Sequence, residues 1–208
     1  SAAAAAQAYP SQPLRMIVPF APGGGTDLTS RLLSQKLPEL LGKQVLVENR
    51  AGAAGNLGTE MVARAPADGY TLLLASLSNS VNPSLFKKLP FDPIHDFEAV
   101  SLVSTVPLLL VVSPAFPANS VGELIAMAKA KPGQLNYASG GNGTANHVGA
   151  ELFKYMAGVD INLVGYKGGG PALGDVVGGH VPIFFGTMTS TRDLARSGRV
   201  KALATTTA

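Results

Sequence analysis

The sequence lacks cysteine, strong charge and any long apolar run. The 208 residues include no cysteine, which excludes disulfides, thiolate metal sites and thiol catalysis. Only 14% of the residues are charged, the net charge is +3, and the basic residues form no stripe interleaved with aromatics, so nucleic acid is not an expected partner. The longest apolar run, residues 106–112, is far shorter than the roughly 20 residues of a membrane-spanning helix, so no membrane insertion is expected.

Two nucleotide-binding patterns are also absent, although the chain contains 24 glycines. The P-loop pattern G-x-x-x-x-G-K-[ST] does not occur. The dinucleotide fingerprint fails because its third small position is Leu28 after the first glycine cluster and Leu173 after the last. A leucine there prevents the close packing of helix on strand that the fingerprint needs. The glycine loops therefore indicate a ligand other than a nucleotide, and no cofactor is expected.

The segments that are present alternate between strand and helix patterns, which predicts an α/β fold. Residues 14–18, 43–48 and 70–75 are apolar strand patterns, and residues 27–41 and 56–65 have helical spacing. The third strand pattern is apolar without alternation, which is typical of a strand buried on both faces. A parallel sheet with helices on either side is therefore expected.

The first glycine cluster lies between a strand and a helix, in the stretch LRMIVPFAPGGGTD at residues 14–27. Glycines let backbone N–H groups approach a ligand, and the first turn of a helix leaves N–H donors unpaired at the positive end of its dipole. A small anion is the expected ligand. Ser76 and Asn79 follow the third strand and are candidate donors beside this loop, or simple helix caps.

The second half of the chain repeats the arrangement of strand, glycines and helix. After an extended segment at 97–114, the loop SGGNG at 139–143 leads to Thr144 and a helix with His147 in its first turn. A third unit places Tyr166 and Lys167 before three glycines and a helix. A final strand at 200–206 suits a return to the first domain.

Two functions from different classes fit these residues. Neutral loops offering N–H groups and hydroxyls from two halves of the chain suit capture of a small carboxylate. The alternative is an α/β serine hydrolase-like enzyme that uses Ser139 or Ser76 with His147 and Asp27, although G-x-S-x-G is absent. His147 and Glu151 form only a single i, i+4 pair, so no metal site is expected.

Four segments in order carry a family resemblance: IVPFAPGGGTDLTSR, VENRAGAAGNLGTEMVARAPADGYTLL, YASGGNGTANHVGAELFKYMAG and VGYKGGGPALGDVVGGHV. Together they resemble the Bug family, the TctC-type periplasmic receptors of tripartite tricarboxylate transporters. The resemblance implies a two-lobed, type II-like periplasmic binding protein of the Venus-flytrap kind, with a βα-repeat sheet in each lobe. It also implies a non-enzymatic receptor that holds a small carboxylate, of the di- or tricarboxylate, aromatic or amino acid type, between its lobes. The receptor would deliver this ligand to the membrane components of the transporter.

Carried over position by position, the resemblance implies ligand contacts in both lobes. The implied residues are Ala21, Pro22, Gly24, Gly25, Thr26, Asp27, Ser76, Asn79, Ser139, Asn142, Gly143, Thr144, His147, Tyr166 and Lys167. Asp27 is expected either to cap its helix or to accept a hydrogen bond from a ligand hydroxyl or amine.

The expected domains are a first lobe at 9–104, a second lobe at 105–200 and a return strand at 201–208. The resemblance also implies further elements of the first lobe, so we expect a truncated or cleaved product, or completion by another chain or fragment. Ala6-Gln7-Ala8 matches the small-residue end of a secretory signal cleaved before Tyr9, which predicts a periplasmic location.

The first glycine loop generates a direct prediction. Gly24→Val or Gly25→Val is expected to abolish ligand binding, because a side chain would cover the backbone donors, while the second lobe stays folded. Calorimetric titration measures binding, and hydrogen exchange reports on the second lobe. If binding survives either change, the ligand is bound elsewhere.

Overall fold

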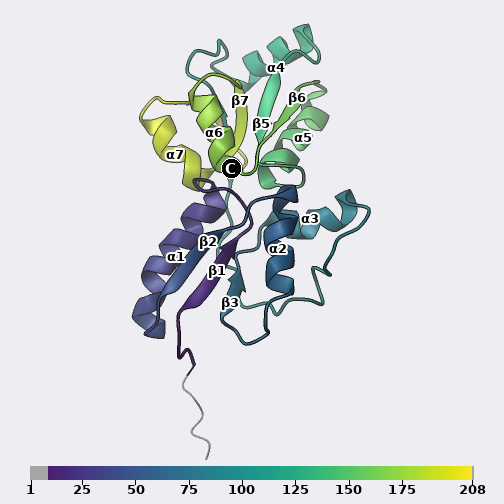
Figure 1. Ribbon diagram of the computed structural model, residues 1–208. Coiled ribbons are helices and arrows are strands. Elements are labelled where there is room, and N and C mark those ends of the chain that lie inside the picture. The colour runs from purple at the N-terminus through teal and green to yellow at the C-terminus, as the bar shows by residue number, and fades with distance from the viewer. Residues whose placement is uncertain (1–8, 208) are drawn as a thin grey trace, which may run out of the picture.

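The computed structural model describes residues 9–207, and it has two lobes stacked one on the other, each built on its own sheet (Figure 1). The expected signal cleavage pattern at residues 6–8 lies outside the described residues. Within the described part, no helix combines the length and apolar character needed to cross a membrane. The predicted α/β class and the two sheets are confirmed.

The first lobe contains a three-stranded parallel sheet in the order β2-β1-β3. Its elements, in chain order, are β1 (Leu14–Val18), α1 (Gly25–Leu41), β2 (Val45–Asn49), the short 3₁₀ helix η1 (Ala53–Gly55), α2 (Asn56–Ala63), β3 (Thr71–Leu73) and α3 (Leu77–Leu85). The leucine face of α1 packs on the buried Leu14 and Met16 of β1. The first glycine loop follows the carboxyl end of β1 and therefore lies at the boundary between the lobes.

The second lobe contains a five-stranded sheet in the order β6-β5-β7-β4-β8. Its elements are β4 (Leu108–Val112), α4 (Val121–Ala130), β5 (Asn136–Ser139), α5 (Ala145–Ala157), β6 (Asn162–Gly165), α6 (Gly169–Val177), β7 (Ile183–Thr187), α7 (Met188–Arg196) and β8 (Lys201–Thr205). Strand β5 is parallel to β6 and β7, whereas β4 is antiparallel to β7 and β8.

Both faces of this second sheet are covered, which explains its continuous apolar strands. Ile183 and Phe184 are neighbours on β7, so their side chains point to opposite faces, and both are fully buried. Ile183 packs in a cluster with α4 and α5, and Phe184 packs in a cluster with α6 and α7. The sheet is thus a rigid support for the loops at its edge.

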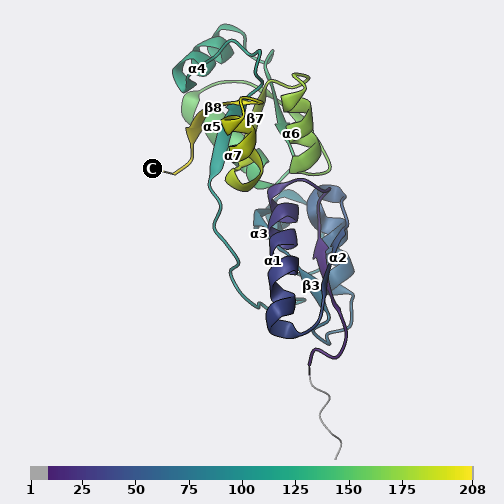
Figure 2. The ribbon, with the colours of Figure 1, turned by 90° about the vertical axis from the view of Figure 1, so that its left-hand side faces the viewer.

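Two sequence predictions differ from the structure. The strand expected to return to the first lobe is β8, and it pairs with β4 in the second sheet, because that edge of β4 offers a free hydrogen-bonding ladder. Of the extended segment at 97–114, only β4 is a strand, and the connection from α3 to β4 runs along the outside of the molecule (Figure 2).

Glu48 joins the edge of the first sheet to its centre. Its carboxylate accepts hydrogen bonds from Arg15 Nε at 2.7 Å and from Arg50 at 2.8 Å. The hydrogen bond from Arg15 is the largest influence, and although burial opposes it, the pKa of Glu48 is lowered to about 2. The charge of Glu48 therefore stabilises the fold at neutral pH.

Glu48→Gln is expected to lower the free energy of unfolding by about 1 kcal/mol at neutral pH, since partly exposed ion pairs are weak. The folded pKa lies below the ordinary value of 4.5, so the stabilisation is complete above pH 4.5 and is lost as pH falls toward 2. Urea denaturation at several pH values measures the difference, with the exposed Glu39→Gln as control. A difference that persists unchanged in acid would contradict this assignment.

Candidate functional site

A cavity of about 60 Å³ lies between the two lobes, at the ends of strands from both sheets. Loops and helix starts from both lobes form its wall, together with the rings of two phenylalanines. The lining residues are Phe20, Gly24, Gly25, Thr26, Asp27, Ser76, Thr144, Ala145, Asn146, Gly169, Phe184, Thr187 and Ser190. A cavity of this size accommodates a small polar group with a few waters.

The N-termini of five helices meet at this cavity. The helix-capping residues Gly24, Ser76, Thr144 and Thr187 line it and precede α1, α3, α5 and α7, and Gly169 is the first residue of α6. Each helix start carries unpaired N–H donors and the positive end of a dipole. Among residues 9–207, no lysine or arginine lines the cavity. Its electrostatic preference for an anion therefore comes from the backbone.

Asp27 is a buried residue of the cavity wall, and its carboxylate accepts three hydrogen bonds from the protein. The side chain is 3% exposed. Oδ2 accepts hydrogen bonds from the Gly23 N–H at 2.9 Å and from Arg31 Nε at 3.0 Å, and Oδ1 accepts one from Asn49 Nδ2 at 2.9 Å. Asp27 thus fixes the first glycine loop onto the start of α1.

Asp27 is ionised at neutral pH, and Arg31 compensates its negative charge. Burial by itself raises the pKa of Asp27, but the hydrogen bonds from Arg31, Gly23 and Asn49 outweigh it, so the pKa lies below its usual value. Arg31 lies one turn further along α1, forms an ion pair with the carboxylate and is half exposed. This pairing reduces the repulsion that Asp27 would exert on an anion in the cavity.

The backbones of the two lobes are in direct contact beside the cavity. The Ala21 N–H donates to the Lys167 carbonyl across the lobe boundary at 2.9 Å. A Cβ atom at Gly170 would lie 2.0 Å from the Pro22 carbonyl oxygen, and one at Gly25 would lie 2.3 Å from Thr187 Oγ1. Glycine is therefore required at both positions for the lobes to approach this closely.

The structure brings together only part of the site residues predicted from sequence. Six of them line the cavity: Gly24, Gly25, Thr26, Asp27, Ser76 and Thr144. Seven line neither this cavity nor the second one described below: Ala21, Pro22, Asn79, Ser139, Asn142, Gly143 and His147. Asn79 illustrates the reason. Its amide oxygen accepts a hydrogen bond from the Ser76 N–H, and its amide nitrogen donates one to the Thr59 hydroxyl. Several of these residues therefore hold the loops in place.

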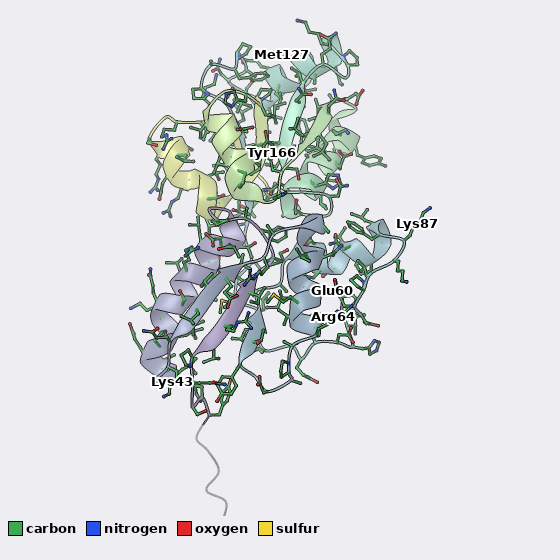
Figure 3. All side chains as sticks on the ribbon, in the orientation of Figure 1. Lys43, Glu60, Arg64, Lys87, Met127 and Tyr166 are labelled. Carbon is green, nitrogen blue, oxygen red and sulfur yellow. The ribbon has the colours of Figure 1, made fainter. Side chains whose placement is uncertain are left out.

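A second cavity of about 60 Å³ lies at the lobe boundary, and Tyr166 and Lys167 are among its lining residues. Phe20, Gly140 and the segment 52–55 complete its lining. Tyr166 lies in the second lobe just above the boundary (Figure 3). Its hydroxyl donates to Asp175 at 2.5 Å, and burial together with this contact raises its pKa to about 12. The tyrosine is therefore neutral and oriented by α6.

Sequence reasoning missed three polar residues of the first cavity, Asn146, Thr187 and Ser190. A signal for Thr187 and Ser190 was present, since they follow an apolar strand at the start of a helix, as the predicted residues do. Asn146 gave no separate signal, and its side chain donates to the Phe185 carbonyl, which is a contact between elements distant in sequence.

The hydrogen bonds do not support a serine hydrolase. The Ser139 hydroxyl donates to the Gly141 carbonyl and lies 3.3 Å from the Thr144 hydroxyl, and Ser76 contacts Ser78. Neither serine bonds to a histidine among residues 9–207, and His147 Nδ1 is occupied by the Gly143 N–H. The described residues also include no cluster of three or more possible metal ligands.

Asp27→Asn is expected to lower the free energy of unfolding by about 1–3 kcal/mol, because an amide group would face three donors and leave Arg31 unpaired. Urea denaturation at neutral pH measures this loss. Asp193→Asn is the control, because Asp193 is exposed and its carboxylate bonds only to Arg192. Equal stability of the Asp27 and Asp193 variants would show that Asp27 does not hold the loop.

Sequence comparison identifies the family. Residues 29–208 match the model of the tripartite tricarboxylate transporter family receptor, TctC. The protein BugT of Bordetella pertussis is 43% identical over 206 residues, which are 98% of this chain and 63% of BugT. The chain therefore spans about three fifths of the length of the curated relatives it matches.

Similarity to solved structures agrees with the family assigned from sequence. The periplasmic binding protein BugD is 38% identical, with a TM-score of 0.92, and the match covers 96% of this chain and 67% of BugD. A Rhodopseudomonas palustris protein solved with adipate is 36% identical, with a TM-score of 0.93 over 96% of this chain and 67% of that one. The family consists of receptors and not of enzymes. The chain belongs to the TctC, or Bug, family of solute-binding receptors of tripartite tricarboxylate transporters.

Proposed function

We propose that this protein captures a small carboxylate in the cavity between its lobes and delivers it to the membrane components of a tripartite tricarboxylate transporter. The observation that carries the proposal is the convergence of five helix N-termini on one cavity without a lysine or arginine in its wall. A carboxylate accepts several backbone N–H bonds at once, and such charge-assisted bonds are about twice as strong as neutral ones.

The arrangement of the lobes supports capture between them. The donors come from α1 and α3 of the first lobe and from α5, α6 and α7 of the second. An anion in the cavity would therefore contact both lobes and offset the repulsion among the like ends of their dipoles. Closure of the lobes would then depend on the charge of the ligand.

The engagement of Asp27 narrows the ligand class. Its two oxygens already accept three hydrogen bonds from the protein. A ligand amine would find little acceptor capacity here, because only Oδ1 keeps an unused lone pair and Asp27 is the only carboxylate among the described residues of the cavity wall. We therefore favour a carboxylate without an amino group over an amino acid.

The family and its relatives support a periplasmic location. BugD is a periplasmic binding protein, and the receptors of this transporter family work with membrane-embedded partners. A receptor in this compartment holds its ligand between two lobes and releases it when they separate. The proposal thus combines a local anion site with a role in transport.

Calorimetric titration with acetate, adipate and citrate tests the proposal. At least one carboxylate should bind without turnover, and the neutral diamide of adipate should bind at least about tenfold more weakly than adipate, because it lacks the charge that the dipoles stabilise. Ester cleavage that is lost in His147→Ala would instead overturn the receptor function in favour of a hydrolase. Failure of all three carboxylates to bind would also contradict it.

A further inference from the structure

The two lobes hold their glycine loops by the same hydrogen bond but with different acceptors. In the first lobe the Gly23 N–H donates to the Asp27 carboxylate, four residues later, at 2.9 Å. In the second lobe the Gly143 N–H donates to His147 Nδ1, also four residues later, at 3.2 Å. Each acceptor is the third residue of the helix that follows its loop. The carboxylate and the imidazole thus occupy equivalent positions.

The bond to Gly143 fixes the state of the imidazole. A backbone N–H can only donate, so Nδ1 of His147 must be unprotonated and the ring must carry its single proton on Nε2. A doubly protonated ring has no acceptor and cannot form this bond. The contact therefore exists only in the neutral form of His147.

The surroundings of His147 are compatible with a neutral ring. Partial burial lowers its pKa, Glu151 opposes this effect and Lys154 adds to it, and both charged groups lie on the same helix. Of the strands packed on α5, β5 carries only Tyr137, which donates to Glu151, and β4 and β7 carry no titratable side chain. Helix α3, which contacts Gly143 through Asn82 and Leu85, carries none either.

The other contacts that hold this loop do not titrate in the same range. The Thr144 hydroxyl donates to the Gly141 carbonyl at 2.7 Å, and the Ser139 hydroxyl accepts from the Gly141 N–H at 3.3 Å. The loop continues directly into Thr144, which lines the cavity at the start of α5. Among these contacts, only the hydrogen bond to the His147 imidazole depends on a group that titrates near neutral pH. Residues 139–143 are called the donor loop of the second lobe below.

We propose that His147 is a positioning residue that holds the donor loop of the second lobe through Gly143, and that its protonation releases the loop and weakens carboxylate binding. The binding consequence rests on the proposed function, whereas the loop attachment does not. Asp27 keeps its acceptor in mild acid, so the first lobe would retain its loop. The receptor would then lose ligand in mild acid through one lobe alone.

NMR of the protein without ligand tests the attachment independently of the proposed function. Between about pH 7.5 and pH 5, the Gly143 amide resonance should shift along the titration curve of His147. In His147→Gln, whose amide oxygen can accept the same bond without titrating, the Gly143 resonance should stay constant. A Gly143 resonance that does not follow His147 in the wild-type protein would overturn the proposal.

Calorimetry with adipate tests the consequence for binding. Loss of one hydrogen bond predicts about fivefold to tenfold weaker binding at pH 5 than at pH 7.5, beyond the change seen in His147→Gln. Titration of adipate itself is common to both proteins and cancels in this comparison. His180→Gln, which replaces an exposed histidine, should behave as the wild type does. Equal pH dependence of the wild type and His147→Gln would contradict the binding step, and absence of adipate binding in every variant would count against the proposed function instead.

Discussion

The unpaired N–H groups at the helix N-termini are the constraint on which this structure depends. Five helices from two lobes direct their positive ends at one cavity, which has no lysine or arginine in its wall. Like dipole ends repel each other, so the arrangement is favourable only if an acceptor or an anion satisfies the donors. The sheets position these helix ends, and the glycines beside them let the lobes touch backbone to backbone.

Several polar residues at or near the cavity hold the loops that carry the backbone N–H donors. Asp27 ties the first glycine loop to α1, and His147 ties the second to α5. Asn79 completes a capping box with Ser76 at the start of α3. A site made of backbone groups needs such supports, because the position of each N–H is set by the loop that carries it. This explains why a side-chain inventory alone is a poor guide to the cavity.

The strands, the helices and the glycine loops could be predicted from the sequence, because apolar periodicity and turn residues act locally. Strands β1 and β2 and helices α1 and α2 lie where their patterns predict them, within a few residues. Contacts between distant segments could not be read in the same way. The pairing of β8 with β4 and the approach of Gly170 to Pro22 depend on the packing of whole lobes. Thr187 and Ser190 follow the same local pattern as the predicted residues, but the position of the start of α7 at the cavity depends on how the second lobe packs against the first.

A crystal structure of this protein with adipate is the most direct test of the central claim. One adipate carboxylate is expected in the cavity between Gly25, Thr144 and Thr187, where it accepts hydrogen bonds from backbone N–H groups of both lobes. The same carboxylate bound mainly by lysine or arginine side chains, or bound outside the boundary between the lobes, would contradict it.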